Sequence, residues 1–81
     1  MKLPRDVSGD ELAKRLRVFG YQISRQAGSH LRLTTIERGE HHVTIPRHDP
    51  IKIGTLAGIL GDVEEHFDLK REEVIVRVFG R

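Results

Sequence analysis

Residues 21–46, YQISRQAGSHLRLTTIERGEHHVTIP, decide the fold, because apolar and polar residues alternate along them in three short runs. Turn-forming residues separate the runs, first at Gly28 and Ser29 and then in ERGE (37–40). Alternation with a period of two is typical of strands that bury one face and expose the other. The stretch therefore predicts three antiparallel strands joined by short turns, with one polar face open to water.

The residues before this stretch predict a helix. Ser8 is a good N-cap, Glu11 can complete a capping box three residues later, and Gly20 ends the pattern. The apolar positions recur at helical spacing and form one stripe that can face a core: Leu12, Leu16 and Phe19.

A second helix is predicted within IGTLAGILGDVEEHF (53–67), whose apolar residues follow the spacing of a core-facing stripe. It contains three glycines, each costing up to about 1 kcal/mol relative to alanine, so we expect the helix to approach the sheet closely at these positions. Asp68 could cap a further turn through Glu73. The β-branched segment VIVRVFG (74–80) favours a strand or an extended tail. The predicted order is α-β-β-β-α, with the structure of residues 74–81 left open.

The element order predicts an α+β fold, and the length of the chain predicts a single domain covering residues 1–81, since 81 residues fit one core. Because the chain has no cysteine, neither disulfides nor a thiolate metal site can stabilise the fold. So small a core leaves little room for an internal cavity, and we expect the substrate to lie on an open face. No apolar run approaches the roughly 20 residues of a membrane span, and no signal-peptide core follows the first residues. We therefore expect a cytoplasmic protein without a membrane partner.

Positive charge gathers in the first two thirds of the chain, although the net charge is only +2. Residues 1–52 carry ten Lys and Arg against six Asp and Glu, whereas residues 53–81 carry four against six. Ten of the fourteen basic residues are arginine, whose planar guanidinium suits phosphate groups. A nucleic acid is a partner that fits both the charge and the open face.

The polar face of the predicted sheet carries a candidate catalytic residue, His30. It lies just past the turn at Gly28 and Ser29, and the alternation puts it on the same face as Arg32. Histidine transfers protons near neutral pH, because its unperturbed pKa is about 6.5. Arg25 precedes the turn, so cations flank the histidine on both sides in the sequence.

Further basic groups stand in PRHDPIKIG (46–54), which brings Arg47, His48 and Lys52 to the start of the second helix. Helix N-terminal amides together with a lysine can hold a phosphate. These parts fit RNA cleavage, in which a base removes the 2′-hydroxyl proton, an acid protonates the departing oxygen and cations hold the phosphorane. The residues predicted to bind RNA or phosphate are Arg25, Gly28, Ser29, Arg32, Arg47, His48 and Lys52.

Two other functions stay open. A non-catalytic RNA-binding module would have the same arrangement of helices on one face of a sheet. A metal-dependent hydrolase would have to use His41, His42, His48 and Asp49, but neighbouring residues on a strand point to opposite faces, and no helical histidine pair is present. We therefore predict no metal and no cofactor. His66 is expected to act as a favourable charge at the end of the second helix.

Three motifs together resemble the HicA-type (YcfA-like) mRNA interferases, toxins of bacterial and archaeal toxin–antitoxin pairs. They are Gly28-Ser29-His30 after a basic strand, the P-x-H turn (46–48) and the K-x-G-T-L helix opening (52–56), in order within residues 8–60. After residue 60, the acidic GDVEEHFD (61–68) and the β-branched tail differ from the more helical ending of that family.

The resemblance implies a fold similar to double-stranded-RNA-binding domains, with helices packed on one face of a three-stranded antiparallel sheet. It also implies that His30 is the catalytic histidine of a metal-independent ribonuclease. The implied partners are mRNA or other single-stranded RNA as the substrate and a HicB-type antitoxin as the inhibitor. Contact with DNA is expected only through the antitoxin.

Overall fold

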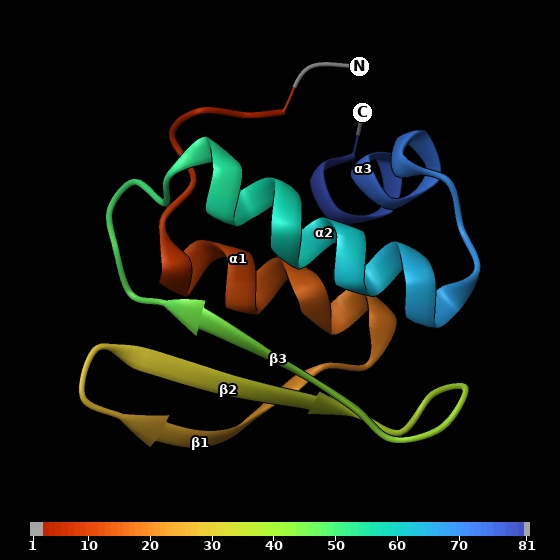
Figure 1. The fold of residues 1–81 in the computed structure, drawn as a ribbon, viewed down its shortest axis with the longest axis horizontal. Coiled ribbons are helices and arrows are strands. Elements are labelled where there is room, and N and C mark those ends of the chain that lie inside the picture. Colours follow the sequence, from red (N-terminus) through yellow and green to blue (C-terminus); the bar gives the residue numbers. More distant parts are fainter. Residues whose placement is uncertain (1–2, 81) are drawn as a thin grey trace.

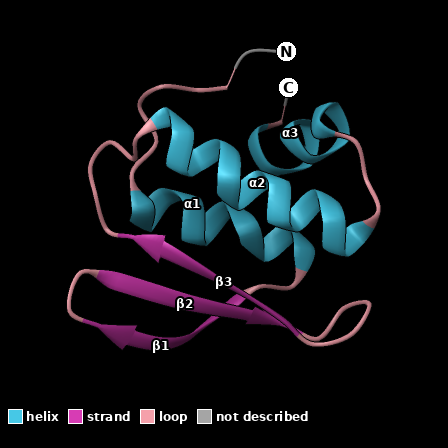
Figure 2. Cartoon of the chain, viewed as in Figure 1, coloured by secondary structure: helices cyan, strands magenta, loops and turns pink. Residues whose placement is uncertain are grey.

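The structure, a computed structural model, describes residues 3–80 as a three-stranded sheet with a layer of helices on one side (Figure 1). Figure 2 shows that all the helices lie on this side of the sheet. This confirms the predicted α+β fold class and adds one helix to the predicted order. The elements are α1 (Gly9–Arg15), the 3-10 helix η1 (Leu16–Phe19), β1 (Gln22–Ala27), β2 (His30–Thr35), β3 (His41–Pro46), α2 (Ile53–Phe67) and α3 (Arg71–Phe79).

The first helix begins and ends where the sequence predicts. The Ser8 Oγ accepts a hydrogen bond from the Glu11 amide at 3.0 Å, as an N-cap does. The Glu11 carboxylate bonds to Arg15 Nε at 2.8 Å, so the second half of the predicted capping box is replaced by an ion pair. The last turn tightens into η1, and Gly20 ends it in the left-handed conformation, with a φ of 82°.

The three strands form one antiparallel sheet in the order β1-β2-β3, as the alternation predicts. The inner face of the sheet packs against α1, η1 and α2, and these surfaces form the core. The core residues of the sheet are Leu31, Leu33, Val43 and Ile45, and those of the helices include Leu12, Leu16, Phe19, Leu56, Ile59, Leu60, Val63 and Phe67. None of the helices within residues 3–80 is both long and apolar enough to cross a membrane.

A β-bulge at Ser24 interrupts the first strand and is not predicted by the sequence. The pairing passes from Ile23 opposite Leu33 to Arg25 opposite Arg32, so two residues of β1 face one residue of β2. Without the bulge, Arg25 would project from the same face as Ile23, toward the helices. The extra residue instead turns Arg25 to the outer face, beside Arg32.

The C-terminal segment, whose structure the sequence leaves open, forms a helix, α3, and not the strand or extended tail that its β-branched residues favour. Asp68 does not begin a further turn: it is the C-cap of α2, with a φ of 55°, and α3 begins at Arg71. Three of the four β-branched residues of α3 are buried in contacts with α2 and η1, and this packing outweighs their strand propensity, whereas Val76 is exposed. The buried ones are Val74, Ile75 and Val78.

Polar contacts fix the start of α3. The Lys70 amide donates a hydrogen bond to the Glu73 carboxylate at 3.0 Å. Arg71 forms an ion pair with Glu64 of α2, and its Nη2 donates to the carbonyl of Ala57 at 3.2 Å. The described chain therefore ends in a helix, although the sequence after residue 67 does not suggest one.

The expectation that the α2 glycines lie against the sheet is wrong. Gly54 and Gly58 are exposed, and no atom lies within 4 Å of the position that a Cβ would take at either residue. At Gly61 the nearest such atom belongs to the Arg71 guanidinium, at 3.9 Å. The apolar stripe of α2 faces the core, and these glycines lie outside it. No close approach to the sheet therefore explains the glycines.

Candidate nucleic-acid interface

The face of the sheet that points away from the helices, hereafter the outer face, carries the candidate site. Paired residues of antiparallel strands project from the same face, so each set of partners forms a row across the sheet. Rows two residues apart along a strand are separated by about 6.7 Å. From the β1–β2 turn onward, the rows are Ala27, His30 and Pro46; then Arg25, Arg32 and Thr44; then Gln22, Thr34 and His42.

His30 is the first residue of β2 and is exposed. Within residues 3–80 its ring makes no ion pair with another side chain. Gly28 begins the two-residue turn before it with a φ of 57°, as the first position of a type II′ hairpin requires. No atom lies within 4 Å of where a Gly28 Cβ would be, so the approach to His30 over this turn is open.

Arg25 and Arg32 lie directly opposite each other, in the row next to His30. Both are exposed, and neither forms an ion pair with a carboxylate in the described part of the chain. Like charges directly opposite each other destabilise a sheet. An anionic ligand on the outer face would turn this unfavourable pair into a favourable contact.

The loop that follows β3 is tied to both neighbouring segments. The Arg47 amide donates to the Ser29 carbonyl at 2.7 Å, and the Gly9 amide donates to the His48 carbonyl at 2.9 Å. Arg47 also binds the Asp10 carboxylate with two hydrogen bonds, of 3.0 and 3.2 Å, and this carboxylate raises the pKa of Arg47. The guanidinium of Arg47 therefore already has an anionic partner within the protein.

Lys52 is the N-cap of α2 and is exposed. The start of α2 lies at the same end of the molecule as the β1–β2 turn but in the helical layer (Figure 1). The structure therefore brings Arg25 and Arg32 beside His30 on the outer face, whereas Lys52 and His48 belong to the connection between the two layers.

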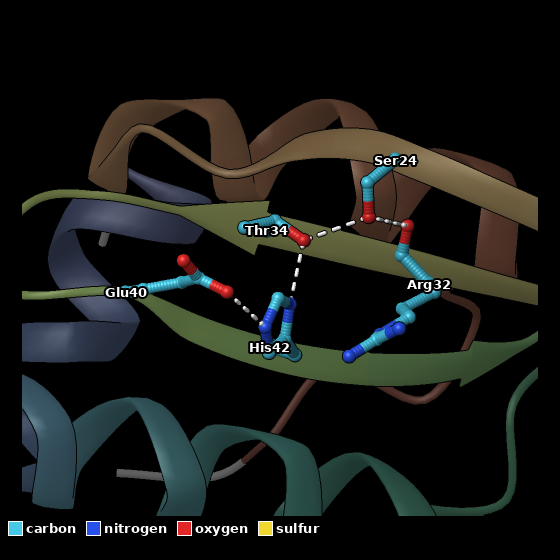
Figure 3. A network of polar contacts seen from close by, with 5 residues as sticks. All are labelled: Ser24, Arg32, Thr34, Glu40 and His42. Carbon is cyan, nitrogen blue, oxygen red and sulfur yellow. Dashed lines mark hydrogen bonds and ion pairs between the residues drawn. The ribbon is translucent and has the colours of Figure 1, made fainter.

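A chain of hydrogen bonds on the outer face involves residues that the sequence pattern did not assign to the site (Figure 3). The Ser24 hydroxyl lies 3.1 Å from the Arg32 carbonyl and 2.7 Å from Thr34 Oγ1. Thr34 Oγ1 lies 2.7 Å from His42 Nδ1, and His42 Nε2 lies 2.8 Å from the Glu40 carboxylate. The one available signal was the alternation, which places Thr34 and His42 on the polar face.

His41 belongs to the other side of β3, as the alternation predicts. Its Nδ1 lies 2.8 Å from the hydroxyl of Tyr21, which is buried. Burial raises the pKa of Tyr21 to about 12, and Asp62 adds to this effect. Within residues 3–80, no group of three or more His, Asp or Glu side chains is arranged to hold a metal ion.

The fold and the outer face define a small α+β domain with the element order of double-stranded-RNA-binding domains, presenting a histidine and paired arginines on its open sheet. The chain belongs to the HicA toxin family of bacterial toxin–antitoxin systems, whose sequence model matches residues 9–64. Members of this family are mRNA interferases, so the predicted resemblance is confirmed. The match includes His30 and ends before α3. The searches of curated proteins and of solved structures gave no match.

Proposed function

We propose that the protein cleaves single-stranded RNA on the outer face of its sheet, without a metal ion, and that His30 is the catalytic base. The observation that carries this proposal is the position of His30 beside Arg25 and Arg32, on a surface without a carboxylate partner for either arginine within residues 3–80. Family membership supports the reaction class, and the grouping of these three residues on one face supports their proposed roles.

The proposed reaction uses the ribose itself as the nucleophile. His30 removes the proton of the 2′-hydroxyl, the 2′-oxygen forms a bond to phosphorus, and the bond from phosphorus to the 5′-oxygen breaks. The leaving oxygen takes a proton from water on this open face. Arg25 and Arg32 hold the charge that develops on the phosphorane oxygens. The products are a 2′,3′-cyclic phosphate and a 5′-hydroxyl end.

The other predicted residues bind RNA around this centre. The turn at Gly28 and Ser29 gives the RNA backbone access to His30. His48 and Lys52 contact phosphates farther along the strand, where it passes the loop at residues 47–52. Arg47 contributes less to RNA binding, because its guanidinium already binds the Asp10 carboxylate.

The substrate in the cell is mRNA in the cytoplasm, and a HicB-type antitoxin is the inhibitor. Both proposals follow from the family. DNA lacks the 2′-hydroxyl and is not cleaved by this route. Contact with DNA would come only through the antitoxin.

A cleavage assay with matched substrates tests the proposal. Purified protein is mixed with a single-stranded RNA, or with DNA of the same sequence, with and without EDTA. We expect cleavage of the RNA at the same rate in both conditions and none of the DNA. Cleavage that stops with EDTA would identify a metal-dependent hydrolase. Binding of RNA without cleavage would identify a non-catalytic RNA-binding module.

A further inference from the structure

The chain from Ser24 through Thr34 and His42 to Glu40 lies on the outer face, and the proposed cleavage step does not use it. Its members come from all three strands and from the loop before β3. Figure 3 shows that they point toward one another and that Arg32 projects from the same face. A network of this kind is costly to assemble on an exposed surface, since each side chain loses rotamer freedom.

The network holds the ring of His42 in one orientation. Nδ1 is engaged by Thr34 and Nε2 by Glu40, so neither nitrogen is left over for a ligand. The His42 side chain is nevertheless 34% exposed. An exposed planar ring, held in one orientation on an open sheet, is a surface on which RNA-binding proteins stack bases.

The Glu40 carboxylate can discriminate between nucleobases. One of its oxygens, Oε2, is bonded to His42, and the side chain remains 68% exposed. A carboxylate oxygen accepts hydrogen bonds and donates none. It therefore favours a base edge with an exocyclic amino group, as in adenine, cytosine or guanine. Uracil presents carbonyl oxygens where these groups would be, and its one donor on this edge, N3–H, lies between two oxygens that the carboxylate repels.

We infer that His42 and Glu40 form a base-binding subsite for single-stranded RNA, in which an amino-bearing base stacks on His42 and donates to Glu40. This inference rests on the proposed function, because it takes RNA as the ligand. The row of His42 lies two rows from that of His30, about 13 Å along β2. Arg25 and Arg32 occupy the row between, where the backbone crosses. The subsite sets a nucleotide preference at one position, a few nucleotides from the scissile bond.

Sequencing of cleavage sites tests the subsite. A pool of RNAs with randomised sequence is digested with wild-type protein and with variants, and the nucleotides around each cut are counted. We expect wild-type cuts to be depleted of uridine at one fixed position and His42→Ala to lose this depletion. Glu40→Gln, whose amide can also donate, should accept uridine there. Glu72→Gln, an exposed carboxylate of α3, serves as the control and should leave the pattern unchanged.

Binding measurements separate stacking from a structural role. His42→Ala should lower the affinity for single-stranded RNA by at least about fivefold. His42→Phe keeps a ring but loses both hydrogen bonds, so it should bind RNA more tightly than His42→Ala and less tightly than the wild type. Thr34→Val frees the His42 ring without removing it and should give an intermediate loss. This variant also replaces His42→Ala in the test should the latter fail to fold.

The outcomes also distinguish the subsite from the proposed function. An unchanged cleavage pattern in His42→Ala would overturn the subsite and leave the function standing. If wild-type protein does not cleave RNA, the proposed function fails. The subsite is then decided by the affinities for oligo(A) and oligo(U). A preference for oligo(A) that His42→Ala abolishes supports it, and equal preferences in the two proteins overturn it.

Discussion

The imidazole rings of His41 and His66 are stacked, with 4.3 Å between their centroids and 10° between their planes. His41 begins β3 and His66 stands in the last turn of α2, so the stack joins the sheet to the helical layer. His66 Nε2 also donates a hydrogen bond to the Glu37 carbonyl at 2.8 Å. The predicted helix-end histidine thus holds the β2–β3 loop, at the end of the sheet away from His30.

This contact predicts a loss of stability at acidic pH. Burial lowers the pKa of His41 from its ordinary value of 6.5, and His66 lowers it further. Asp62 and Glu65 act in the opposite direction, and His42 adds to the lowering. The folded protein then binds fewer protons at His41 than the unfolded chain does. The neutral His41 therefore contributes its full stabilisation above about pH 6.5, and this contribution is lost as the pH falls through the pKa of His41 in the folded protein. The melting temperature of the wild type should fall more on acidification than that of His41→Gln. Equal falls would contradict this account.

The exposed glycines of α2 predict a stabilising substitution. Gly58 lies within the helix, and a Cβ there meets no other atom within 4 Å. Gly58→Ala should therefore raise the free energy of unfolding by up to about 1 kcal/mol, because alanine loses less backbone entropy in a helix. Urea denaturation measures the change.

The matched control for this substitution is Gly9→Ala. A Cβ on Gly9 would lie 2.2 Å from the Pro46 carbonyl oxygen, because the start of α1 packs directly on the end of β3. This variant should be strongly destabilised. Stabilisation of both variants, or of neither, would show that the packing around these helices differs from the structure.

The opposed arginines predict a change in the salt dependence of RNA binding. Each phosphate contact contributes to the slope of log affinity against log salt, so Arg25→Ala and Arg32→Ala should each weaken binding and reduce this slope by about one. Arg17→Ala, which removes an exposed arginine from η1, should leave the slope unchanged. The same loss in all three variants would mean that RNA senses only the net charge and not the outer face.

Local signals in the sequence were sufficient to predict the first helix and the sheet. Ser8 and Gly20 mark the ends of α1 and η1, and the alternation in β2 and β3 separates core from solvent without ambiguity. The same alternation places His30 and Arg32 on one exposed face. These features depend on residues close together in the chain.

The features that could not be predicted depend on distant contacts. The bulge at Ser24, which turns Arg25 outward, depends on the pairing of β1 with β2. One added residue cannot be recognised in so short a run of alternating residues. Helix α3 contains β-branched residues whose burial against α2 and η1 overrides local propensity. The contact of His42 with Glu40 and Thr34 requires the register between β2 and β3, which the alternation alone does not give.

The measurement that tests the central claim most directly is a comparison of wild type with His30→Ala on one single-stranded RNA in EDTA. Because the His30 side chain is exposed and makes no ion pair within residues 3–80, the variant should have the melting temperature and RNA affinity of the wild type. A positioned base contributes about 10²–10⁴ in rate, so cleavage should fall by at least about a hundredfold. Wild-type fragments should end in 2′,3′-cyclic phosphate. Equal cleavage by the two proteins would contradict the role of His30.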